Sequence, residues 1–175
     1  MISTDLWQLK FGVEVSARYH EWRRDTMESN GRWTRAATFA AAIATLFTAL
    51  SSPKLAAIVS LAIIIAVVNL WELIAGWPHA ACLHAELYRR FAELQAKVVN
   101  VVEPDPLQIA EWEAEAARIR RDEPATMWAV YAMCWNQTIA RHEAEEKGYY
   151  RDILWWQQAF ANVLHFTPQA FPPMV

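Results

Sequence analysis

Few residues in this chain stand at a spacing that supports catalysis or metal binding. His79 and His84 are five residues apart, about 140° around a helix axis, so their imidazoles diverge instead of sharing a metal ion. His142-Glu143 lacks the second histidine of a zincin helix, and the sequence contains no glycine-rich phosphate loop, nucleophile elbow or paired acid motif. Only four glycines occur in 175 residues, which makes most loop-based active sites hard to build. We therefore expect neither an enzyme nor a bound metal or cofactor.

The polar residues of greater interest interrupt two apolar runs. Between Arg35 and Glu72 the only charged residue is Lys54, in the turn that separates the runs. The strongest polar groups of the second run are Asn69 and Glu72. An amide or carboxylate at membrane depth costs on the order of a few kcal/mol unless it is paired or wetted. We therefore expect Asn69 and Glu72 to face protein or water.

The two runs predict a transmembrane hairpin with spans at residues 36–52 and 55–77. A bilayer core needs roughly 20 apolar residues, so the first run is marginal in length and the second is sufficient. The alternative is a buried hairpin in a soluble four-helix domain, but residues 55–71 lack the solvated stripe of such a helix. A signal peptide is disfavoured, because about 35 polar, tryptophan-rich residues precede the first run.

Basic residues orient the hairpin. Five arginines between residues 18 and 35 precede it and three basic residues follow by residue 97, against Lys54 alone in the turn. The positive-inside rule therefore places both termini in the cytoplasm, with Trp33, Trp71 and Trp77 as anchors near the inner headgroups. The expected domains are a cytoplasmic N-terminal amphipathic helix in residues 1–35, the hairpin in residues 36–77, and a cytoplasmic helical region in residues 78–175.

Helical periodicity dominates the rest of the chain, and no stretch alternates long enough to predict a sheet. The expected fold is an all-α membrane protein, a two-helix transmembrane hairpin with a cytoplasmic helical bundle. Residues 3–30 carry two apolar ridges, and Gly76-Trp77-Pro78 marks a break. Apolar residues at alternating steps of four and three then form a bundle-type seam: Leu87, Phe91, Leu94, Val98 and Val101.

Capping signals predict the later helices. Asp105 caps a helix that runs to about Arg121, and Asp122 with Pro124 starts another that runs to Lys147. Residues 149–166 form a tryptophan-rich amphipathic helix, which we expect to pack on the bundle rather than lie on the bilayer, because it carries few cations. Cys82 and Cys134 are expected to be small buried hydrophobes, not a disulfide.

The first span also has a face of small and hydroxylated residues, in which Thr38, Thr45 and Ser52 recur every seven residues. In the structural interpretation, Asn69 bonds across the hairpin and Glu72 is neutralised by Arg35. In the functional interpretation, these five polar residues line a pore: Thr38, Thr45, Ser52, Asn69 and Glu72. Two spans cannot enclose a water-filled path, so a pore requires a ring of copies.

Three arginine groups are candidates for binding an anionic ligand, because guanidinium groups suit phosphates. They are Arg23 with Arg24, Arg89 with Arg90, and Arg118 with Arg120 and Arg121. The alternative is simple helix-surface pairing, of Arg89 and Arg90 with Glu86 and Glu93 and of the third group with nearby glutamates. The net charge of −3 and pI near 5.9 argue against binding to a nucleic-acid duplex.

Several short motifs resemble the SLATT family, two-transmembrane effectors associated with SMODS and SLOG domains. They are Arg18-Tyr19-His20-Glu21-Trp22-Arg23-Arg24, the tight hairpin, the long helix after it, and Asp122-Glu123-Pro124 with Cys134 and Asn136. The resemblance implies a bacterial inner-membrane effector of anti-phage defence that oligomerises into a pore. It also implies a gating signal from a nucleotide second messenger or a separate signalling protein.

A second class of function remains open from the residues alone. The chain would be a non-conducting membrane anchor or adaptor that recruits a cytoplasmic partner through an aromatic surface. That surface would consist of Trp112, Trp128, Trp135, Trp155 and Trp156.

Overall fold

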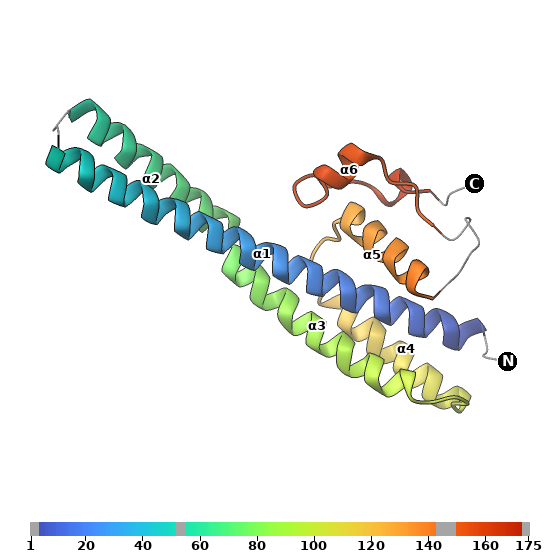
Figure 1. Ribbon diagram of the computed structural model, residues 1–175. Helices are drawn as coiled ribbons and strands as arrows, with labels where there is room; N and C mark the ends of the chain where they lie inside the picture. The colour runs from blue at the N-terminus through green and yellow to red at the C-terminus, as the bar shows by residue number, and fades with distance from the viewer. Residues whose placement is uncertain (1–3, 52–54, 143–149, 173–175) are drawn as a thin grey trace. The chain divides into compact units, whose positions relative to one another are not determined.

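The computed structural model describes residues 4–51, 55–142 and 150–172. Five helices of 14 residues or more lie in these ranges and confirm the all-α class: α1 (Thr4–Ser51), α2 (Leu55–Ala75), α3 (Trp77–Val99), α4 (Pro106–Arg121) and α5 (Trp128–Arg141) (Figure 1). The short helices α6 (Trp155–Ala159) and η2 (Pro168–Ala170) follow. Two helical segments, Leu6–Ser51 and Leu55–Val99, are long and apolar enough to cross a membrane.

The helices belong to two compact units. The hairpin unit is Trp22–His84, and the bundle unit is Met1–Glu21 with Ala85–Val175. Helices α1 and α3 each contribute residues to both units, because each continues through a unit boundary without a break.

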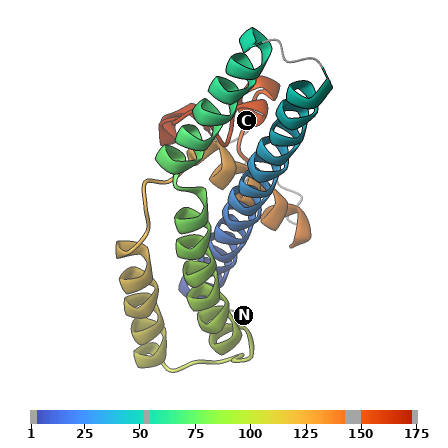
Figure 2. The same ribbon diagram turned by 90° about the vertical axis from the view of Figure 1, so that its left-hand side faces the viewer.

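In the hairpin unit, the last part of α1 runs antiparallel to α2 (Figures 1 and 2). The half-buried residues of each helix recur every three or four positions, which is the spacing of one helical face. On α1 they are Thr34, Thr38, Ala41, Thr45 and Thr48, and on α2 they include Ile58, Leu61, Ile65, Val68 and Glu72. Two helices therefore cover one face of each other and leave the remaining faces open.

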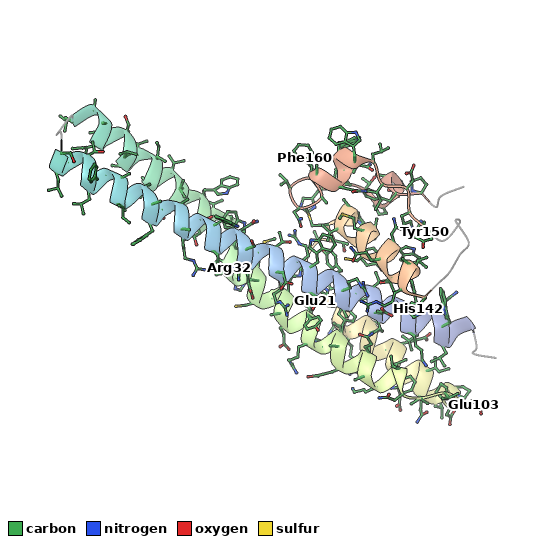
Figure 3. All side chains as sticks on the ribbon, viewed as in Figure 1. Glu21, Arg32, Glu103, His142, Tyr150 and Phe160 are labelled. Carbon is green, nitrogen blue, oxygen red and sulfur yellow. The ribbon has the colours of Figure 1, made fainter. Side chains whose placement is uncertain are left out.

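The outer faces of this hairpin are strongly apolar. No residue of α2 is buried, and Ile63, Val67 and Leu73 are 57%, 60% and 78% exposed. Figure 3 shows side chains on this hairpin that are mostly carbon. Apolar surface of this extent is normally withdrawn from water, so the exposed faces of α2 require a covering that the hairpin does not supply.

The predicted break after the second run is confirmed at Gly76. Its φ of +58° is a left-handed conformation, which glycine adopts without the strain that a side chain would add. The N–H of Gly76 still donates to the Glu72 carbonyl at 3.1 Å, and the N–H of Ala80 donates to the Gly76 carbonyl at 3.0 Å. The chain therefore passes from α2 into α3 with little loss of backbone hydrogen bonding.

The core of the bundle unit joins the start of α1 to α3, α4 and α5. The predicted seam is confirmed on α3, where Phe91, Leu94 and Val98 are fully buried, but its last residue, Val101, lies beyond the end of the helix and is half-buried. The two apolar ridges of the first helix are also buried between Leu6 and Tyr19, except that Trp7 is 38% exposed. Trp22, at the end of one ridge, is half-buried. Tyr19 of α1 accepts a hydrogen bond at 3.0 Å from the backbone N–H of Met127, the residue that precedes α5.

The predicted helix 106–121 is confirmed, and its neighbour is corrected. Asp105 accepts from the Leu107 N–H at 3.0 Å, and Gln108 completes a capping box. The helix expected from Asp122 begins only at Trp128 and ends at Arg141. Asp122 does not start it, because its own N–H closes the last turn of α4. The expected end near Lys147 lies outside the described residues.

The tail expected as one helix over residues 149–166 is also corrected. Between residues 150 and 166, which the structure describes, only Trp155–Ala159 is α-helical, and turns follow it. The backbone before α6 is instead engaged in tertiary hydrogen bonds, in which Asn136 binds the main chain of Arg151 and the Asp152 N–H donates to the Pro172 carbonyl at 3.0 Å. A helix through these residues would have to give up those bonds.

One of the two cysteine predictions is wrong. Cys134 is buried as expected, whereas Cys82 is exposed. The buried side of α3 includes His84, Leu87 and Phe91. Cys82 lies two residues before His84 and thus on the opposite side of the helix.

Candidate functional site

A polar cluster interrupts the apolar hairpin. It consists of Arg35 and Thr38 on α1 with Asn69 and Glu72 on α2, and we call it the hairpin polar cluster. Within each helix the two residues are three positions apart, about one turn, and therefore neighbours on one face. Antiparallel pairing sets Arg35 opposite Glu72, with Nε 3.7 Å from Oε1. The Thr38 hydroxyl donates to Oδ1 of Asn69 at 3.4 Å.

The cluster is only partly satisfied by the chain itself. The side chain of Glu72 is 20% exposed, and that of Arg35 is 67% exposed. Asn69 is an exposed residue, and its amide nitrogen has no hydrogen-bond partner among the described residues. Both N–H donors of that amide can therefore bind water or a polar group of another molecule.

The structure brings together three of the five predicted pore-lining residues. Thr38, Asn69 and Glu72 meet in the hairpin polar cluster. Thr45 lies two turns further along α1, half-buried against α2, and its hydroxyl donates to the Ala41 carbonyl of its own helix at 2.8 Å. Ser52 lies outside the described residues. Both contacts of the structural interpretation, across the hairpin and from Arg35 to Glu72, are present.

Three of the seven candidate anion-binding arginines pair with acidic side chains, and two of these are Arg89 and Arg90 on α3. Arg89 pairs with Glu86 and Glu93, and Arg90 with Asp122 at 2.7 Å. The hydrogen bond from Arg89 lowers the pKa of Glu86 below its usual range, and the same contact raises the pKa of Arg89. These acids compete with any phosphate for the guanidinium groups. The helix-pairing interpretation is met by Arg89, whereas the acidic partner of Arg90 is Asp122, beyond the end of α4, and not Glu86 or Glu93.

The other candidate arginines are dispersed. In the hairpin unit, Arg24 pairs with Asp25 at 2.7 Å and Arg23 is buried. In the bundle unit, Arg120 and Arg121 are exposed at the end of α4. Within the bundle unit, the guanidinium of Arg120 also lies against Gly12, where an added Cβ would stand 3.5 Å from Nη2.

Sequence reasoning missed a groove beside the hairpin polar cluster. It is an open groove of about 440 Å³ with almost wholly apolar walls, lined by Trp33, Thr34, Ala37, Val67, Val68 and Trp71. Trp33 and Trp71 were expected as separate interfacial anchors. The antiparallel pairing of Arg35 with Glu72 is the signal that could have placed these two indoles on neighbouring turns.

In the parts of the chain that the structure describes, no group of three or more His, Cys, Asp or Glu side chains could hold a metal ion. His79 is exposed and His84 is buried, in keeping with their divergence around a helix. Comparison with protein-family models, curated proteins and solved structures finds no match to this chain.

Proposed function

We propose that the hairpin unit spans a bacterial inner membrane and that several copies assemble into a gated pore. The observation that carries the proposal is the hairpin polar cluster, which places an exposed amide and a partly exposed carboxylate on an apolar hairpin whose spans carry no charge between Arg35 and Glu72. A polar group in that setting needs water or a polar partner, and a pore between copies supplies both.

The exposed apolar surface supports a membrane location. The most apolar windows of both candidate spans contain no buried residue, whereas a core helix of a soluble protein is mostly buried. Lipid would cover Ile63, Val67 and Leu73 without any further partner. The excess of basic residues flanking the hairpin favours an orientation with both termini in the cytoplasm.

Assembly of several copies is supported by the surface around Asn69. Ala62, Ala66 and Asn69 are exposed and follow one another at steps of four and three on α2. Small side chains let helices approach closely, so neighbouring copies can pack on this stripe and bring their Asn69 amides together. Glu72, one turn further, would then form a ring that favours cations.

The resemblance to SLATT proteins supports a role in anti-phage defence and a cytoplasmic trigger. The trigger would be a nucleotide second messenger or a separate signalling protein. It would be received outside the spans, in the bundle unit or at the arginines near the hairpin.

The test is ion flux from liposomes that contain the purified full-length chain. Asn69→Leu and Glu72→Leu should abolish flux and leave assembly intact, as judged by chemical cross-linking. The matched control is Ser60→Leu, which also replaces a polar residue of α2 by leucine. Ser60 is exposed, and its hydroxyl already donates to the Ala56 carbonyl at 2.9 Å. Flux that persists in both cluster variants would contradict the lining proposed here.

The membrane location has a test of its own. A chain that is monodisperse in buffer without detergent would overturn the hairpin topology and the pore together. A membrane-potential dye in bacteria that overexpress the chain would report on the pore in its natural setting, and depolarisation is the expected result.

The second candidate is a non-conducting adaptor, and one observation favours it. The segment around α6 exposes Trp155, Phe160 and Val163 at 79%, 49% and 72%, a surface suited to a cytoplasmic partner. This function predicts a partner that co-purifies with the chain and is lost on Trp155→Ser, with no flux from liposomes.

A further inference from the structure

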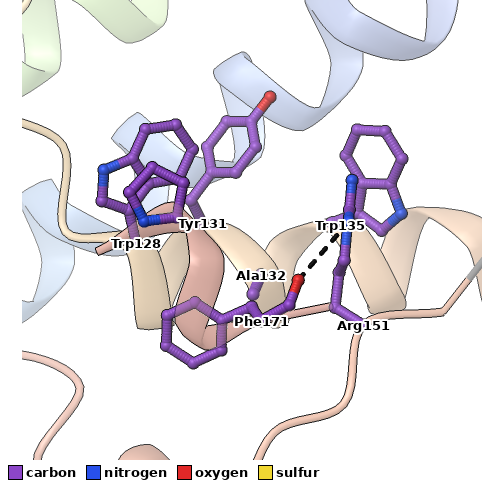
Figure 4. Close-up of a pocket in the computed structure, with 7 residues that line it drawn as sticks. Trp128, Tyr131, Ala132, Trp135, Arg151 and Phe171 are labelled. Atoms are coloured by element: carbon purple, nitrogen blue, oxygen red, sulfur yellow. Dashed lines mark hydrogen bonds between the residues drawn. The ribbon is translucent and has the colours of Figure 1, made fainter. Parts of the chain in front are cut away.

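The bundle unit contains a pocket between α5 and the C-terminal segment. Its volume is about 130 Å³, and its walls come from residues far apart in the sequence (Figure 4). Helix α5 supplies three rings and the small floor residue Ala132, and the C-terminal segment supplies Arg151, Pro168 and Phe171. The three rings are Trp128, Tyr131 and Trp135.

The spacing on α5 explains the aromatic wall. Tyr131, Ala132 and Trp135 follow Trp128 by three, four and seven residues, so all four share one helix face. Ring contacts hold this wall in place. The rings of Trp128 and Tyr131 pack edge to face with their centroids 5.6 Å apart, and the rings of Trp135 and Phe11 of α1 do so with centroids 4.7 Å apart. The wall is thus pre-formed, which spares a ligand the cost of ordering it.

The opposite wall is held by backbone hydrogen bonds. The side-chain amide of Asn136 donates to the Arg151 carbonyl at 2.8 Å, and its oxygen accepts from the Arg151 N–H at 2.7 Å. Because both bonds reach the main chain of Arg151, a change of the Arg151 side chain leaves them intact. The side chain can therefore be altered without releasing the segment from α5.

The Arg151 guanidinium lies at the pocket and has no acidic partner in residues 4–51, 55–142 and 150–172. Its central carbon is 5.0 Å from the ring centroid of Trp135, and Nη1 donates to the Phe171 carbonyl at 3.4 Å. Among the described residues, no carboxylate lies within ion-pair distance of it, in contrast to Arg89 and Arg90. A guanidinium carries five N–H donors, so most of them remain for an oxyanion.

We infer that this pocket binds a single aromatic ring that bears an oxyanion, with the ring among the side chains of α5 and the carboxylate or phosphate on Arg151. The size of the cavity supports a ligand of one ring, since a dry cavity of about 150 Å³ accommodates benzene. The lining supports a planar π-system, because aromatic pairs gain attraction beyond the area they bury. This site does not depend on the proposed pore.

Equilibrium dialysis with the full-length chain in detergent micelles tests the inference. The probes are benzoate and phenyl phosphate, compared with benzamide, a neutral molecule of nearly the same shape as benzoate. At least one anion should saturate a single site, and benzamide should bind roughly ten- to a hundredfold more weakly. The anion with the higher affinity identifies the acid group that the site prefers.

Three variants distinguish a probe bound in the pocket from a probe taken up by the detergent micelles. Arg151→Met should remove the preference for the anion, and Ala132→Leu should fill the pocket and weaken all probes. The matched control Arg141→Met makes the same substitution at an exposed arginine of α5, outside the pocket, and should leave affinity unchanged. Far-UV circular dichroism checks that each variant is folded. If Arg151→Met does not fold, binding to the Ala132→Leu variant tests the inference. Failure of both anions to bind, equal binding of benzamide, or unchanged binding to the folded Arg151→Met or Ala132→Leu chain would overturn the inference.

Discussion

The two cysteines should differ in reactivity by a large factor. Cys134 on α5 is fully buried, and burial, which penalises the thiolate, raises its pKa from 9.0 to about 12. Nearby Arg18 opposes this effect and does not overcome it. Cys82 is exposed. Since the thiolate is the reactive form, the raised pKa alone slows alkylation of Cys134 about a thousandfold at neutral pH, and burial slows it further.

Single-cysteine variants isolate the two thiols. Cys82→Ser leaves only Cys134, and Cys134→Ala leaves only Cys82. Reaction with iodoacetamide at pH 8, followed by mass spectrometry of the intact chain, should modify the Cys134→Ala variant rapidly and the Cys82→Ser variant about a thousandfold more slowly. In a denaturant the two variants should react at similar rates. Rapid modification of Cys82→Ser in the folded state would refute the burial of Cys134 and the packing of α5.

The same pKa has a consequence for stability. The folded chain holds the Cys134 proton more tightly than the unfolded chain does, so the protonated thiol contributes to the free energy of unfolding. This contribution is fully present below pH 9 and is lost as the pH rises toward 12. The loss across this window is about 4 kcal/mol. Denaturant unfolding of the parent and of Cys134→Ala at several pH values measures it, because the difference between them cancels the other titrating groups. Parallel pH profiles would contradict the expectation.

Three further predictions concern the bundle unit. Leu94→Ala, at a fully buried site, should lower the free energy of unfolding by about 2–5 kcal/mol, whereas Leu107→Ala, 72% exposed, should change it by less than about 0.5 kcal/mol in the same denaturant titration. Asn136→Ala removes two hydrogen bonds to Arg151 and should cost about 1–3 kcal/mol, visible as a lower Tm in near-UV circular dichroism; an unchanged Tm would argue against the clamp. Asp105→Ala removes the cap of α4 and should cost about 1 kcal/mol by thermal unfolding, with Asp105→Asn retaining most of it.

Local signals in the sequence predicted much of the fold. The seam Leu87 to Val98 and the cap at Asp105 were recognisable because helical period and capping depend on residues within a few turns. The start of α5 was predicted wrongly because it depends on contacts between residues far apart in the sequence. Asp122 can cap a helix by its chemistry, but in the fold its N–H closes α4 and its carboxylate meets Arg90, a contact made across 32 residues.

The candidate site was predicted in part. That Asn69 and Glu72 are the strong polar groups of an apolar run is visible in the sequence. A bond from Asn69 across the hairpin and the pairing of Glu72 with Arg35 were one of two interpretations, but Thr38 was not predicted as the partner of Asn69. The aromatic pocket was not predicted. Its tryptophans were noticed as a set, but neither the helical face they share nor the return of Arg151 to them follows from spacing along the chain.

The sequence by itself determined the all-α class, the capped helix from residue 106 to 121, the apolar hairpin and the residues that interrupt it, because helix periodicity, capping and hydropathy are properties of neighbouring residues. Only the tertiary structure decided that the tail after Arg151 is mostly non-helical, that Cys82 is exposed while Cys134 is buried, and that Arg151 meets an aromatic wall. The physical reason is that hydrogen bonds and packing between distant segments, such as Asn136 with Arg151, outweigh local helix propensity where the two compete.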